Sequence, residues 1–312
     1  MASKKVGIVG GVGEHHTMHM KSVLENLGAE AVVIDTLNFP DRVTFSLRNE
    51  SPVYQGKGVE DIVAFYNRTV FYSEPPYDLQ DKIDAGELPH LKSWYSVYAA
   101  ERERQSLLGS WLRAVAFQCN RVVNPVECFH LHHLKPHQLV MLRRAGIVVP
   151  ETLVTNNPEE LKEFKAQVKE VIYKPVAGGA SCNLLKDEDM VPERLSLLSS
   201  APVLFQKLHA GDDIRVFVLD GRVLCALEIE TEALDYRGHE QAINVIDLPD
   251  AVAQMCIKAA EVCSMKFTGI DLKRSATGEF VMLEANPSPM FIGFQTRSGF
   301  PIDQELAKYL MG

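Results

Sequence analysis

Two acidic residues near the end of the chain have a spacing that could hold a divalent cation. The apolar runs Thr268–Lys273 and Phe280–Ala285 are typical of strands, and Thr277-Gly278 predicts a two-residue hairpin loop between them. In that register Asp271 lies directly opposite Glu284. Like charges that face each other across a ladder destabilise it unless a counter-charge is present.

A magnesium ion would supply this counter-charge. Asn286 is on the same face of the predicted hairpin as Glu284, two residues further along. Oxygen atoms of Asp, Glu and Asn side chains are ligands that suit Mg²⁺. The sequence therefore predicts a magnesium site at Asp271, Glu284 and Asn286. The alternative is an exposed hairpin face on which the acidic side chains point into water, and the register by itself leaves both interpretations open.

A glycine-rich segment earlier in the chain could bind phosphate. Lys174 ends an apolar run, and small residues follow it as far as Ser181. The backbone N–H groups of such a loop can approach phosphate oxygens while the lysine neutralises their charge. This spacing is not that of a P-loop, so the segment alone identifies no nucleotide site. The earlier run Gly10–Gly13 lacks the dinucleotide-binding fingerprint and predicts a tight strand-to-helix turn.

A cysteine, two arginines and a cluster of histidines could also take part in chemistry, but each has a structural interpretation as well. Cys182 has no evident His partner or helix terminus, which favours a small packing residue over a nucleophile. Arg237 and Arg297 could bind an anionic substrate, and an exposed ion pair is the alternative. Zinc is the less favoured interpretation of a histidine cluster that lacks nearby cysteines and carboxylates. The clustered histidines are His130, His132, His133 and His137.

The elements that position these residues can be predicted from periodicity. The chain opens as a strand–helix–strand unit, with strands at Val6–Val9 and Ala31–Ile34 and a helix that Gly28 ends. Residues 40–95 are rich in Pro, Tyr and Asp and predict no definite element. An apolar face from Leu107 to Val115 predicts a helix.

A second unit is predicted from about Asn124-Pro125 onward. Asn157, Pro158 and Glu160 form a helix start, with Asn as the N-cap and Glu three residues later. Asp220-Gly221 predicts a two-residue hairpin loop. The remaining expected elements are helices at 135–146 and 251–262 and strands at 171–174, 203–208, 214–219 and 222–229.

Composition limits the class of protein. The chain has 312 residues, 46% hydrophobic and 23% charged, which is typical of a globular protein with a sizeable core. Its 32 basic and 41 acidic residues give a net charge of −9, which argues against a broadly basic nucleic-acid surface. No apolar run is long enough to span a membrane. Six cysteines without framework spacing predict reduced thiols and a cytoplasmic protein.

Seven short motifs occur in an order that resembles ATP-grasp ligases of the RimK-like branch. The chain is most similar to the microviridin-type (graspetide) peptide ligases, which form side-chain esters and amides. Asp235-Tyr236-Arg237 supports this closer resemblance, although the usual motif has Trp where this chain has Tyr236. The seven motifs are Lys135-Pro136-x-Gln138-Leu139, Gly146-Ile147-x-Val149-Pro150-x-Thr152, Tyr173-Lys174-Pro175, Gln206-Lys207-Leu208, Asp213-Ile214-Arg215-Val216, Gly269-Ile270-Asp271 and Glu284-Ala285-Asn286-Pro287.

The resemblance implies a role for each matching residue. Lys135 and Lys174 would contact the phosphates of ATP under the loop of Gly178, Gly179 and Ser181. The strand residues Gln206, Lys207 and Leu208 would read the adenine edge, and Asp213 would lie near the ribose. Asp271, Glu284 and Asn286 would hold Mg²⁺. Arg215, Lys174 and Arg237 would be the catalytic residues, with Arg215 stabilising the transferring phosphoryl group.

The resemblance also implies a fold and an activity. The fold would combine α/β and α+β parts: an N-terminal α/β (pre-ATP-grasp) domain at 1–122 and an ATP-grasp domain at 123–312, whose two lobes meet near 201–208 and clamp ATP. The activity would be ATP-dependent joining of a carboxylate to an amine or hydroxyl, on a peptide or amino-acid substrate such as a ribosomally made precursor peptide. Neither nucleic acid nor membrane is an expected partner, and a homodimer is an expected form. The alternatives are a RimK-like amino-acid ligase, an ATP-grasp kinase of a hydroxyl group and a nucleotide-binding regulatory protein.

Overall fold

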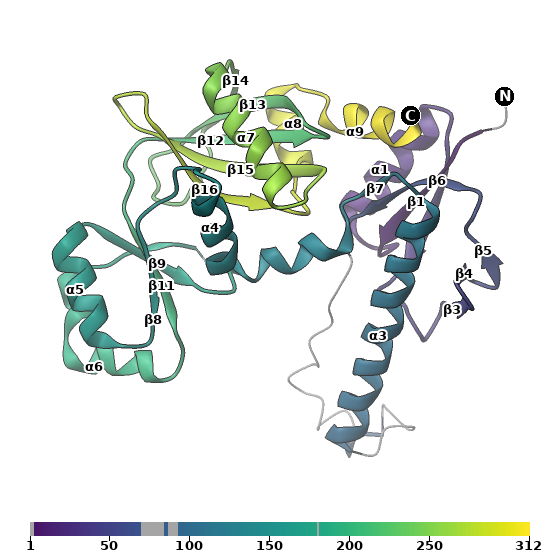
Figure 1. Ribbon diagram of the computed structural model, residues 1–312, viewed down its shortest axis with the longest axis horizontal. Coiled ribbons are helices and arrows are strands. Elements are labelled where there is room, and N and C mark those ends of the chain that lie inside the picture. Colours follow the sequence, from purple (N-terminus) through teal and green to yellow (C-terminus); the bar gives the residue numbers. More distant parts are fainter. Residues whose placement is uncertain (1–2, 70–83, 87–92, 180) are drawn as a thin grey trace. The chain divides into compact units, whose positions relative to one another are not determined.

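The computed structural model describes residues 3–69, 84–86, 93–179 and 181–312, which form two compact units (Figure 1). Unit 1 consists of Met1–Val126 together with Asp303–Gly312, and unit 2 of Glu127–Ile302. The C-terminal helix α9 (Ile302–Met311) therefore belongs, from Asp303 on, to the same unit as the N-terminus. The sequence-based boundary at 122/123 did not include this return of the chain.

A parallel four-stranded sheet forms the centre of unit 1. Its first strand is fully buried at Val6, Ile8 and Val9, because apolar side chains occupy both faces. The predicted strand–helix–strand opening is confirmed, and Gly28 ends the helix with a φ of +87°. In spatial order the strands are β2 (Glu30–Asp35), β1 (Lys5–Gly10), β6 (Ile62–Asn67) and β7 (Val122–Val123).

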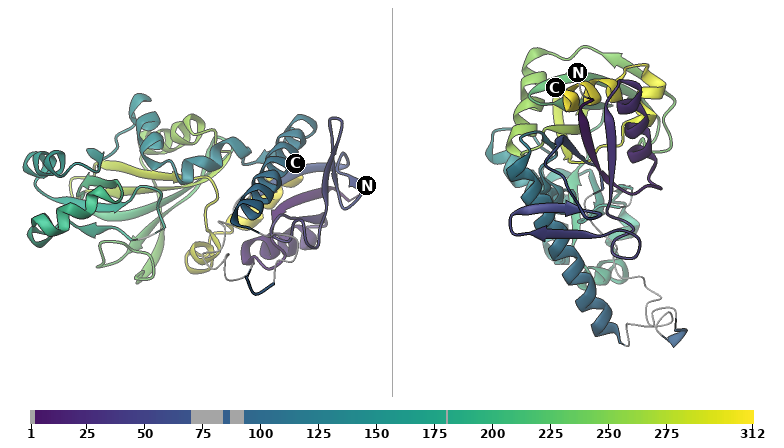
Figure 2. Two further views of the ribbon diagram at one scale, coloured as in Figure 1. Left: turned by 90° about the horizontal axis from the view of Figure 1, so that it is seen from below. Right: turned by 90° about the vertical axis from the view of Figure 1, so that its right-hand side faces the viewer.

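Besides α9, unit 1 contains further helices and a small antiparallel sheet. The long helix α3 runs alongside the parallel sheet (Figure 2) and buries Trp111, whose ring meets Phe65 edge-on and whose indole N–H donates to the Val53 carbonyl at 3.1 Å. This helix is longer than the apolar face at 107–115 had indicated, because its first turns bury no side chain and carry exposed aromatic residues such as Trp94 and Tyr95. The elements are α1 (His15–Asn26), α3 (Trp94–Gln118), β3 (Phe45–Arg48), β4 (Ser51–Tyr54) and β5 (Lys57–Gly58).

The first lobe of unit 2 is a four-stranded antiparallel sheet. The helix α5 starts where Asn157 and Pro158 predict, and the Asn157 side chain accepts from the Glu159 N–H at 3.0 Å. Glu160 does not complete a capping box, because its carboxylate accepts from the Thr155 hydroxyl at 2.5 Å. In spatial order the strands are β10 (Asn183–Leu184), β9 (Val171–Pro175), β11 (Val203–Lys207) and β8 (Thr152–Thr155).

The second lobe of unit 2 is a five-stranded antiparallel sheet over a core that α7 covers. The predicted two-residue loop at Asp220-Gly221 is confirmed, with φ of +45° and +77° as a type I′ turn requires. In spatial order the strands are β14 (Ala242–Ile246), β13 (Arg222–Glu230), β12 (Asp212–Leu219), β15 (Phe267–Arg274) and β16 (Phe280–Asn286).

Helices in unit 2 position these sheets and their connections. Two hydrogen bonds between a side chain of α4 and the backbone of β16 hold these elements together: the Gln138 amide donates to the Ala285 carbonyl at 2.7 Å and accepts from the Ala285 N–H at 3.0 Å. The helices are α4 (Lys135–Arg144), α5 (Pro158–Val168), α6 (Pro192–Leu195), α7 (Asp250–Val262), α8 (Ile292–Ser298) and the short 3-10 turns at Val126–His132, Asp187–Met190 and Ser196–Ser199.

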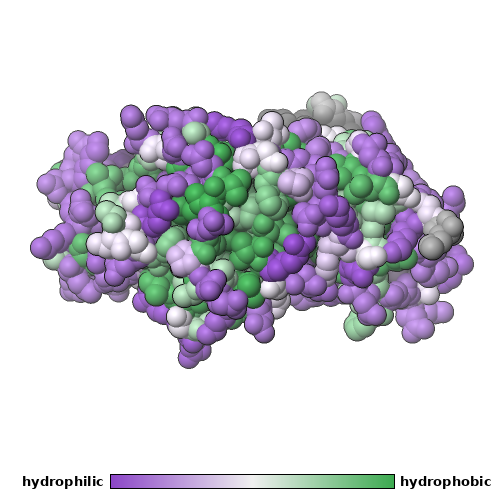
Figure 3. Space-filling view, turned by 90° about the horizontal axis from the view of Figure 1, so that it is seen from above, coloured by the Kyte–Doolittle hydropathy of each residue, from purple (hydrophilic) through white to green (hydrophobic). Residues whose placement is uncertain are grey.

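The surface mixes polar and apolar groups. On the face drawn in Figure 3, hydrophilic side chains surround smaller groups of hydrophobic ones. Among the described residues, no helix has both the length and the apolar character needed to cross a membrane. All six cysteines are free thiols, which agrees with the expectation from their spacing.

Candidate functional site

A row of charged residues crosses three neighbouring strands of the five-stranded sheet. Arg215 on β12 pairs with Asp271 on β15, and Asp271 pairs with Glu284 on β16. Directly paired residues point to the same face of a sheet, so all three side chains lie on one face. Asp271 and Glu284 are therefore cross-strand neighbours, as predicted. The basic side chain of Arg215 lies next to Asp271 on the third strand.

The hairpin that creates this register is not the predicted one. The strands are joined by a three-residue loop, Ala276–Gly278, which the Ser275 N–H closes by donating to the Glu279 carbonyl at 2.9 Å. The prediction of a two-residue loop at Thr277-Gly278 is wrong, because Gly278 with its φ of +82° ends a longer turn. An irregularity in the pairing between Asp271 and Leu272 absorbs the extra residue. The pair Asp271 and Glu284 is thereby restored to the predicted register.

The Arg215 side chain is held by an ion pair and by close packing on its neighbours. Its guanidinium donates to Asp271 Oδ1 at 2.7 Å and lies over the rings of Phe217 and Phe294, at 5.3 and 5.6 Å from their centroids. A Cβ at Gly269 would lie 2.2 Å from Arg215 Nη2, so only glycine leaves room for the guanidinium there. The Arg215 side chain is only 6% exposed, and the carboxylate beside it raises the pKa against the opposing effect of burial.

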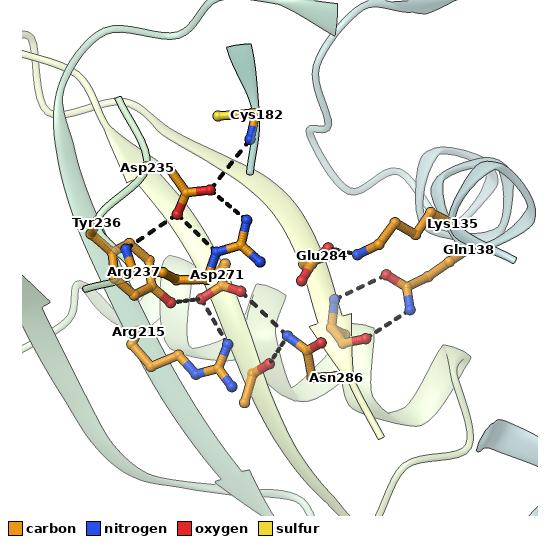
Figure 4. A network of polar contacts seen from close by, with 12 residues as sticks. Lys135, Gln138, Cys182, Arg215, Asp235, Tyr236, Arg237, Asp271, Glu284 and Asn286 are labelled. Carbon is orange, nitrogen blue, oxygen red and sulfur yellow. Dashed lines mark hydrogen bonds and ion pairs between the residues drawn. The ribbon is translucent and has the colours of Figure 1, made fainter. Parts of the chain in front are cut away.

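Asp271 is the centre of the polar network in Figure 4. Besides Arg215, it accepts from the Tyr236 hydroxyl at 3.1 Å and from the Asn286 amide at 3.3 Å. Burial and the nearby Asp271 raise the pKa of Tyr236, which keeps the phenol protonated as a donor. The predicted trio of Asp271, Glu284 and Asn286 is therefore gathered at one place on the sheet.

Glu284 is an ionised carboxylate among cations. It forms an ion pair with Lys135 from α4. Burial opposes its ionisation, but the charges of Lys135, Lys174 and Arg215 outweigh burial and lower the pKa of the carboxyl to about 2. Burial also lowers the pKa of Lys174, whose charge Glu284 in turn favours. The structure brings both predicted lysines and the predicted carboxylate together.

The glycine-rich segment after β9 lies next to Lys135. A Cβ at Gly178 would lie 2.9 Å from the Lys135 Cε, and both Gly178 and Gly179 have left-handed φ angles, +85° and +88°. These positions therefore favour glycine for close approach and for backbone conformation. Ser181 is exposed at the other end of the segment, and Ala180 lies outside the described residues.

The strand predicted to read adenine, β11, lies in the sheet of the first lobe and leads along the chain to β12 of the second lobe. The Gln206 side chain is buried and donates to the Thr152 hydroxyl at 3.0 Å, while its Oε1 has no hydrogen-bond partner among the described residues. The N–H groups of Lys207 and Leu208 already donate to the carbonyls of Glu151 and Glu170, at 3.0 and 2.9 Å. The backbone N–H groups of these two residues are therefore already engaged within the chain.

Asp213 lies two residues before Arg215, on the same face of β12. Burial raises the pKa of its carboxyl, and Lys273 counteracts this by donating to Oδ2 at 2.9 Å. Asp213 was predicted to lie near the ribose of ATP; in the structure its carboxylate is engaged by Lys273.

Arg237 lies on the connection between β13 and β14 and pairs with Asp235 through a fork of hydrogen bonds. Its side chain is 58% exposed, in contrast to the buried Arg215. An exposed guanidinium beside a buried charged row could bind an anionic group that enters from solvent.

The donor set fits Mg²⁺. Two carboxylates and the Asn286 amide lie on one face of the sheet; the carboxylates are paired with Arg215 and Lys135, and the Asn286 nitrogen donates to Asp271. Mg²⁺ is commonly bound by one or two carboxylates together with phosphate oxygens, so this set suits a nucleotide-bound ion. In the described part of the chain, no three His, Cys, Asp or Glu residues gather in an arrangement that would hold a metal alone.

Sequence reasoning missed the partners of the predicted residues. Lys273, Tyr236 and Asp235 each bind a predicted site residue, and Gln138 fixes the strand that carries Glu284. The signal for Lys273 was available, because it lies two residues after Asp271 on the same predicted strand face. The contacts of Tyr236 and Asp235 could not be predicted, because they lie on an irregular connection.

The fold and the site together define an ATP-grasp ligase. Unit 2 has two lobes with antiparallel sheets; one lobe and helix α4 supply lysines, and the other lobe carries the charged row. The protein is an ATP-dependent ligase of this class. A family model described as a RimK-like ATP-grasp domain matches residues 132–310. The chain belongs to the RimK-like ATP-grasp family.

Known structures share this fold over the whole chain. The ATP-grasp ligase PsnB, solved with a phosphomimetic variant of its minimal precursor, Mg and ADP, is 34% identical, with a TM-score of 0.87 over 100% of this chain and 99% of that one. A RiPP-associated ATP-grasp ligase of Chryseobacterium gregarium, solved with ADP and a leader and core peptide, has a TM-score of 0.76 over 99% of this chain and 95% of that one. At 19% identity, the latter shows the fold alone.

Curated relatives are more distant. A probable alpha-L-glutamate ligase of Marinomonas sp. (strain MWYL1) is 23% identical over 310 residues, 95% of this chain and 91% of that protein. Another, from Thioalkalivibrio sulfidiphilus (strain HL-EbGR7), is 24% identical over 188 residues, which are 56% of this chain and 62% of that protein.

Proposed function

We propose that the protein activates a side-chain carboxylate of a peptide as an acyl phosphate and joins it to an amine or hydroxyl of the peptide. The observation that carries this proposal is the charged row of Arg215, Asp271 and Glu284, with Lys135 and Lys174 beside it. Phosphoryl transfer needs positioning and charge neutralisation more than covalent help from the protein.

In this proposal ATP lies between the two lobes of unit 2. Lys135 and Lys174 bind its phosphates, and the backbone at Gly178, Gly179 and Ser181 covers them. The carbonyl oxygens of Lys207 and Leu208, with the buried Gln206 side chain, recognise the adenine edge. Asp213 accepts from the ribose hydroxyls while Lys273 keeps it ionised.

Asp271, Glu284 and Asn286 would hold Mg²⁺. The ion supplies charge neutralisation to the β- and γ-phosphates when it is bound. The two carboxylates are at present paired with Arg215 and Lys135. A cation on these carboxylates would leave both basic side chains free to donate to phosphate oxygens, so the same residues serve both ion pairing and phosphate binding.

Two bond exchanges then complete the reaction. A carboxylate oxygen of the substrate attacks the γ-phosphorus, and the bond from that phosphorus to ADP breaks. Arg215 stabilises the charge on the transferring group, and Arg237 orients the substrate carboxylate from the solvent side. The acceptor amine or hydroxyl next attacks the acyl carbon, loses its proton and releases phosphate, which forms the amide or ester.

A peptide substrate is supported by the solved complexes of similar ligases. PsnB was solved with a minimal precursor and with the precursor peptide PsnA2, and it is 33–35% identical to this chain across those complexes. The exposed Arg237 suits an acidic side chain carried on a chain that remains in solvent. The probable alpha-L-glutamate ligases favour a second candidate, the addition of a free amino acid.

The test is a reaction with Mg·ATP, free glutamate and a synthetic peptide that contains several Thr and Glu residues, followed by mass spectrometry. The proposal predicts ADP formation and the loss of one water from the peptide per bond formed. A gain of a glutamate residue would support the amino-acid ligase, and a gain of a phosphate group would support a kinase. ADP release without any change in peptide mass would contradict ligation.

A further inference from the structure

Asp235 connects two parts of unit 2 that lie far apart in the sequence. It belongs to the connection between β13 and β14, and its carboxylate accepts from the Cys182 N–H at 3.3 Å. Cys182 directly precedes β10, whose Asn183 pairs with Tyr173 on β9. The contact between Asp235 and Cys182 (Figure 4) therefore ends on the β9–β10 hairpin, and β9 carries Lys174.

The same carboxylate also holds Arg237. Asp235 Oδ1 accepts from the Arg237 Nε–H at 2.8 Å and from its backbone N–H at 3.2 Å. Asp235 Oδ2, which accepts from the Cys182 N–H, also pairs with Arg237 Nη2. A fork of this kind fixes the plane of a guanidinium as well as its distance.

The exposure of the two partners distinguishes this pair from an ordinary surface ion pair. The Asp235 side chain is only 14% exposed, whereas that of Arg237 is 58% exposed. A buried anchor therefore holds an exposed cation, while the typical surface pair has two mobile partners. Tyr236, between them, donates to Asp271, so the connection is also tied to the charged row.

We propose that Asp235 is a positioning residue that sets Arg237 relative to the Lys174 hairpin. This inference rests on the proposed function, in which Lys174 binds phosphate and Arg237 binds the substrate carboxylate. In-line attack needs both groups at a defined separation, and small misplacements of a positioned group can reduce a rate strongly. Asp235 touches neither ATP nor peptide in this account.

The two contacts of Asp235 can be separated by substitution. Asp235→Asn keeps an oxygen that can accept from the Cys182 N–H but removes the charge that holds Arg237. Cys182→Pro removes the N–H and leaves the Asp235–Arg237 pair. Cys182→Ala is its matched control, because it removes the thiol and keeps the N–H. Arg237→Ala, alone and with Asp235→Asn, shows whether Asp235 acts through Arg237.

The first experiment measures KM and kcat for the Thr- and Glu-containing peptide and for ATP. Because a charged hydrogen-bonded contact to arginine is lost, Asp235→Asn is expected to raise KM for the peptide about tenfold, with KM for ATP nearly unchanged. Cys182→Pro is expected to lower kcat about tenfold with KM for the peptide nearly unchanged, because the pair persists but is displaced. Cys182→Ala is expected to match the wild type.

The double variant is the sharpest comparison. In the Arg237→Ala background, Asp235→Asn is expected to add no further change in KM for the peptide. A further rise of about tenfold there would overturn the proposal, because Asp235 would then act independently of Arg237. Equal changes in KM for ATP and peptide, or no change in either, would overturn it too. Melting temperatures close to that of the wild type confirm that the variants fold.

A second experiment does not depend on the peptide. Hydrogen exchange of the Cys182 amide is expected to be faster in Asp235→Ala than in the wild type, with Asp235→Asn intermediate. Unchanged exchange in Asp235→Ala would overturn the link to the hairpin even if the wild type is an active ligase. A wild type that forms no amide or ester, but shows the expected exchange, would instead contradict the proposed function.

Discussion

Two glycine-rich turns follow strands in this protein, and their surroundings differ. The first, Gly10–Gly13, joins β1 to α1 in unit 1, and the second, around Gly178 and Gly179, follows β9 in unit 2. In the first turn a Cβ at Gly10 would lie 2.3 Å from the Thr17 hydroxyl, so glycine allows the helix to pack closely. In the second, Gly178 makes room for Lys135.

The first turn satisfies its own polar groups. Glu14 caps α1 by accepting from the Thr17 N–H at 2.6 Å and from its hydroxyl at 2.8 Å, and it pairs with Arg68 at 3.4 Å. The helix N-terminus, a common anion site, is therefore occupied by a residue of the chain itself.

The second turn lies near a group of basic side chains that outnumber the carboxylates paired with them. Lys135, Lys174 and Arg215 share the carboxylates of Glu284 and Asp271, which leaves one positive charge over in this group. In the proposed function, this excess of positive charge is what makes the second turn, and not the first, a phosphate site. Glycine content alone is the same signal in both places.

The largest effect is expected at the cations of unit 2. Lys174→Ala or Arg215→Ala is expected to lower the ligation rate by about 10²–10³ while the fold is kept, because each removes a preorganised charge from the phosphates. Lys162→Ala, at an exposed ion pair with Glu159, is the charge-matched control. Turnover close to normal in either site variant, with intact melting, would remove that residue from the site.

The second effect compares glycines. Gly269→Ala places a Cβ against the Arg215 guanidinium and is expected to lower the rate by about 10², because the arginine must move. Gly13→Ala in the first turn, where a Cβ would meet nothing within 4 Å, is expected to leave the rate near that of the wild type. Steady-state ligation assays measure both, and equal effects would contradict the comparison.

The third effect concerns the stability of unit 1. Burial, assisted by the charge of Arg68, lowers the pKa of His16 to about 4 from its usual 6.5. Below pH 6.5 His16 binds a proton in the unfolded chain but not in the folded unit. The free energy of unfolding therefore decreases as pH falls from 6.5 toward 4. We expect a loss on the order of 2 kcal/mol over that range.

Tryptophan fluorescence can measure this loss in unit 1 alone, because both tryptophans, Trp94 and Trp111, lie in that unit. Urea unfolding of the wild type at pH 7.5 and pH 5 is compared with His16→Gln, which cannot take up the proton. An identical pH dependence in the variant would show that other groups cause the acid sensitivity.

The smallest effect is expected at the cap of the first turn. Glu14→Ala removes the side chain that caps α1 and is expected to destabilise unit 1 by about 1 kcal/mol. The same fluorescence-detected unfolding measures it, and Glu14→Asp, which retains a capping carboxylate, is the control. No difference between the two variants would mean that the cap does not stabilise the turn.

Much of the fold could be predicted because helix starts and turns depend on residues that are close together in the sequence. Asn157 and Pro158 start a helix where expected, and Asp220-Gly221 forms the expected turn, because both depend on local backbone preferences. The register of Asp271 and Glu284 was reached through a wrong loop and an unpredicted irregularity in the pairing. A two-residue loop with regular pairing and a three-residue loop with one extra residue give the same opposition, so the sequence could not separate them.

The rest of the site depends on long-range contacts that periodicity does not contain. The ion pair of Lys135 with Glu284 joins residues 149 positions apart, and the contact of Asp235 with Cys182 joins residues 53 positions apart. The return of residues 303–312 to unit 1 is of the same kind. Such contacts follow from packing of whole elements, which no local pattern encodes.

Calorimetric titration with ATP, in the presence and absence of Mg²⁺, tests the central claim about the charged row most directly. The wild type is expected to bind ATP about tenfold or more tightly with Mg²⁺, and Glu284→Gln and Asp271→Asn are each expected to reduce that difference. The double variant is expected to lose less than the sum of the two, because both carboxylates act on one ion. Equal ATP affinity with and without Mg²⁺, unchanged by Glu284→Gln, would mean that Asp271 and Glu284 serve only their internal ion pairs.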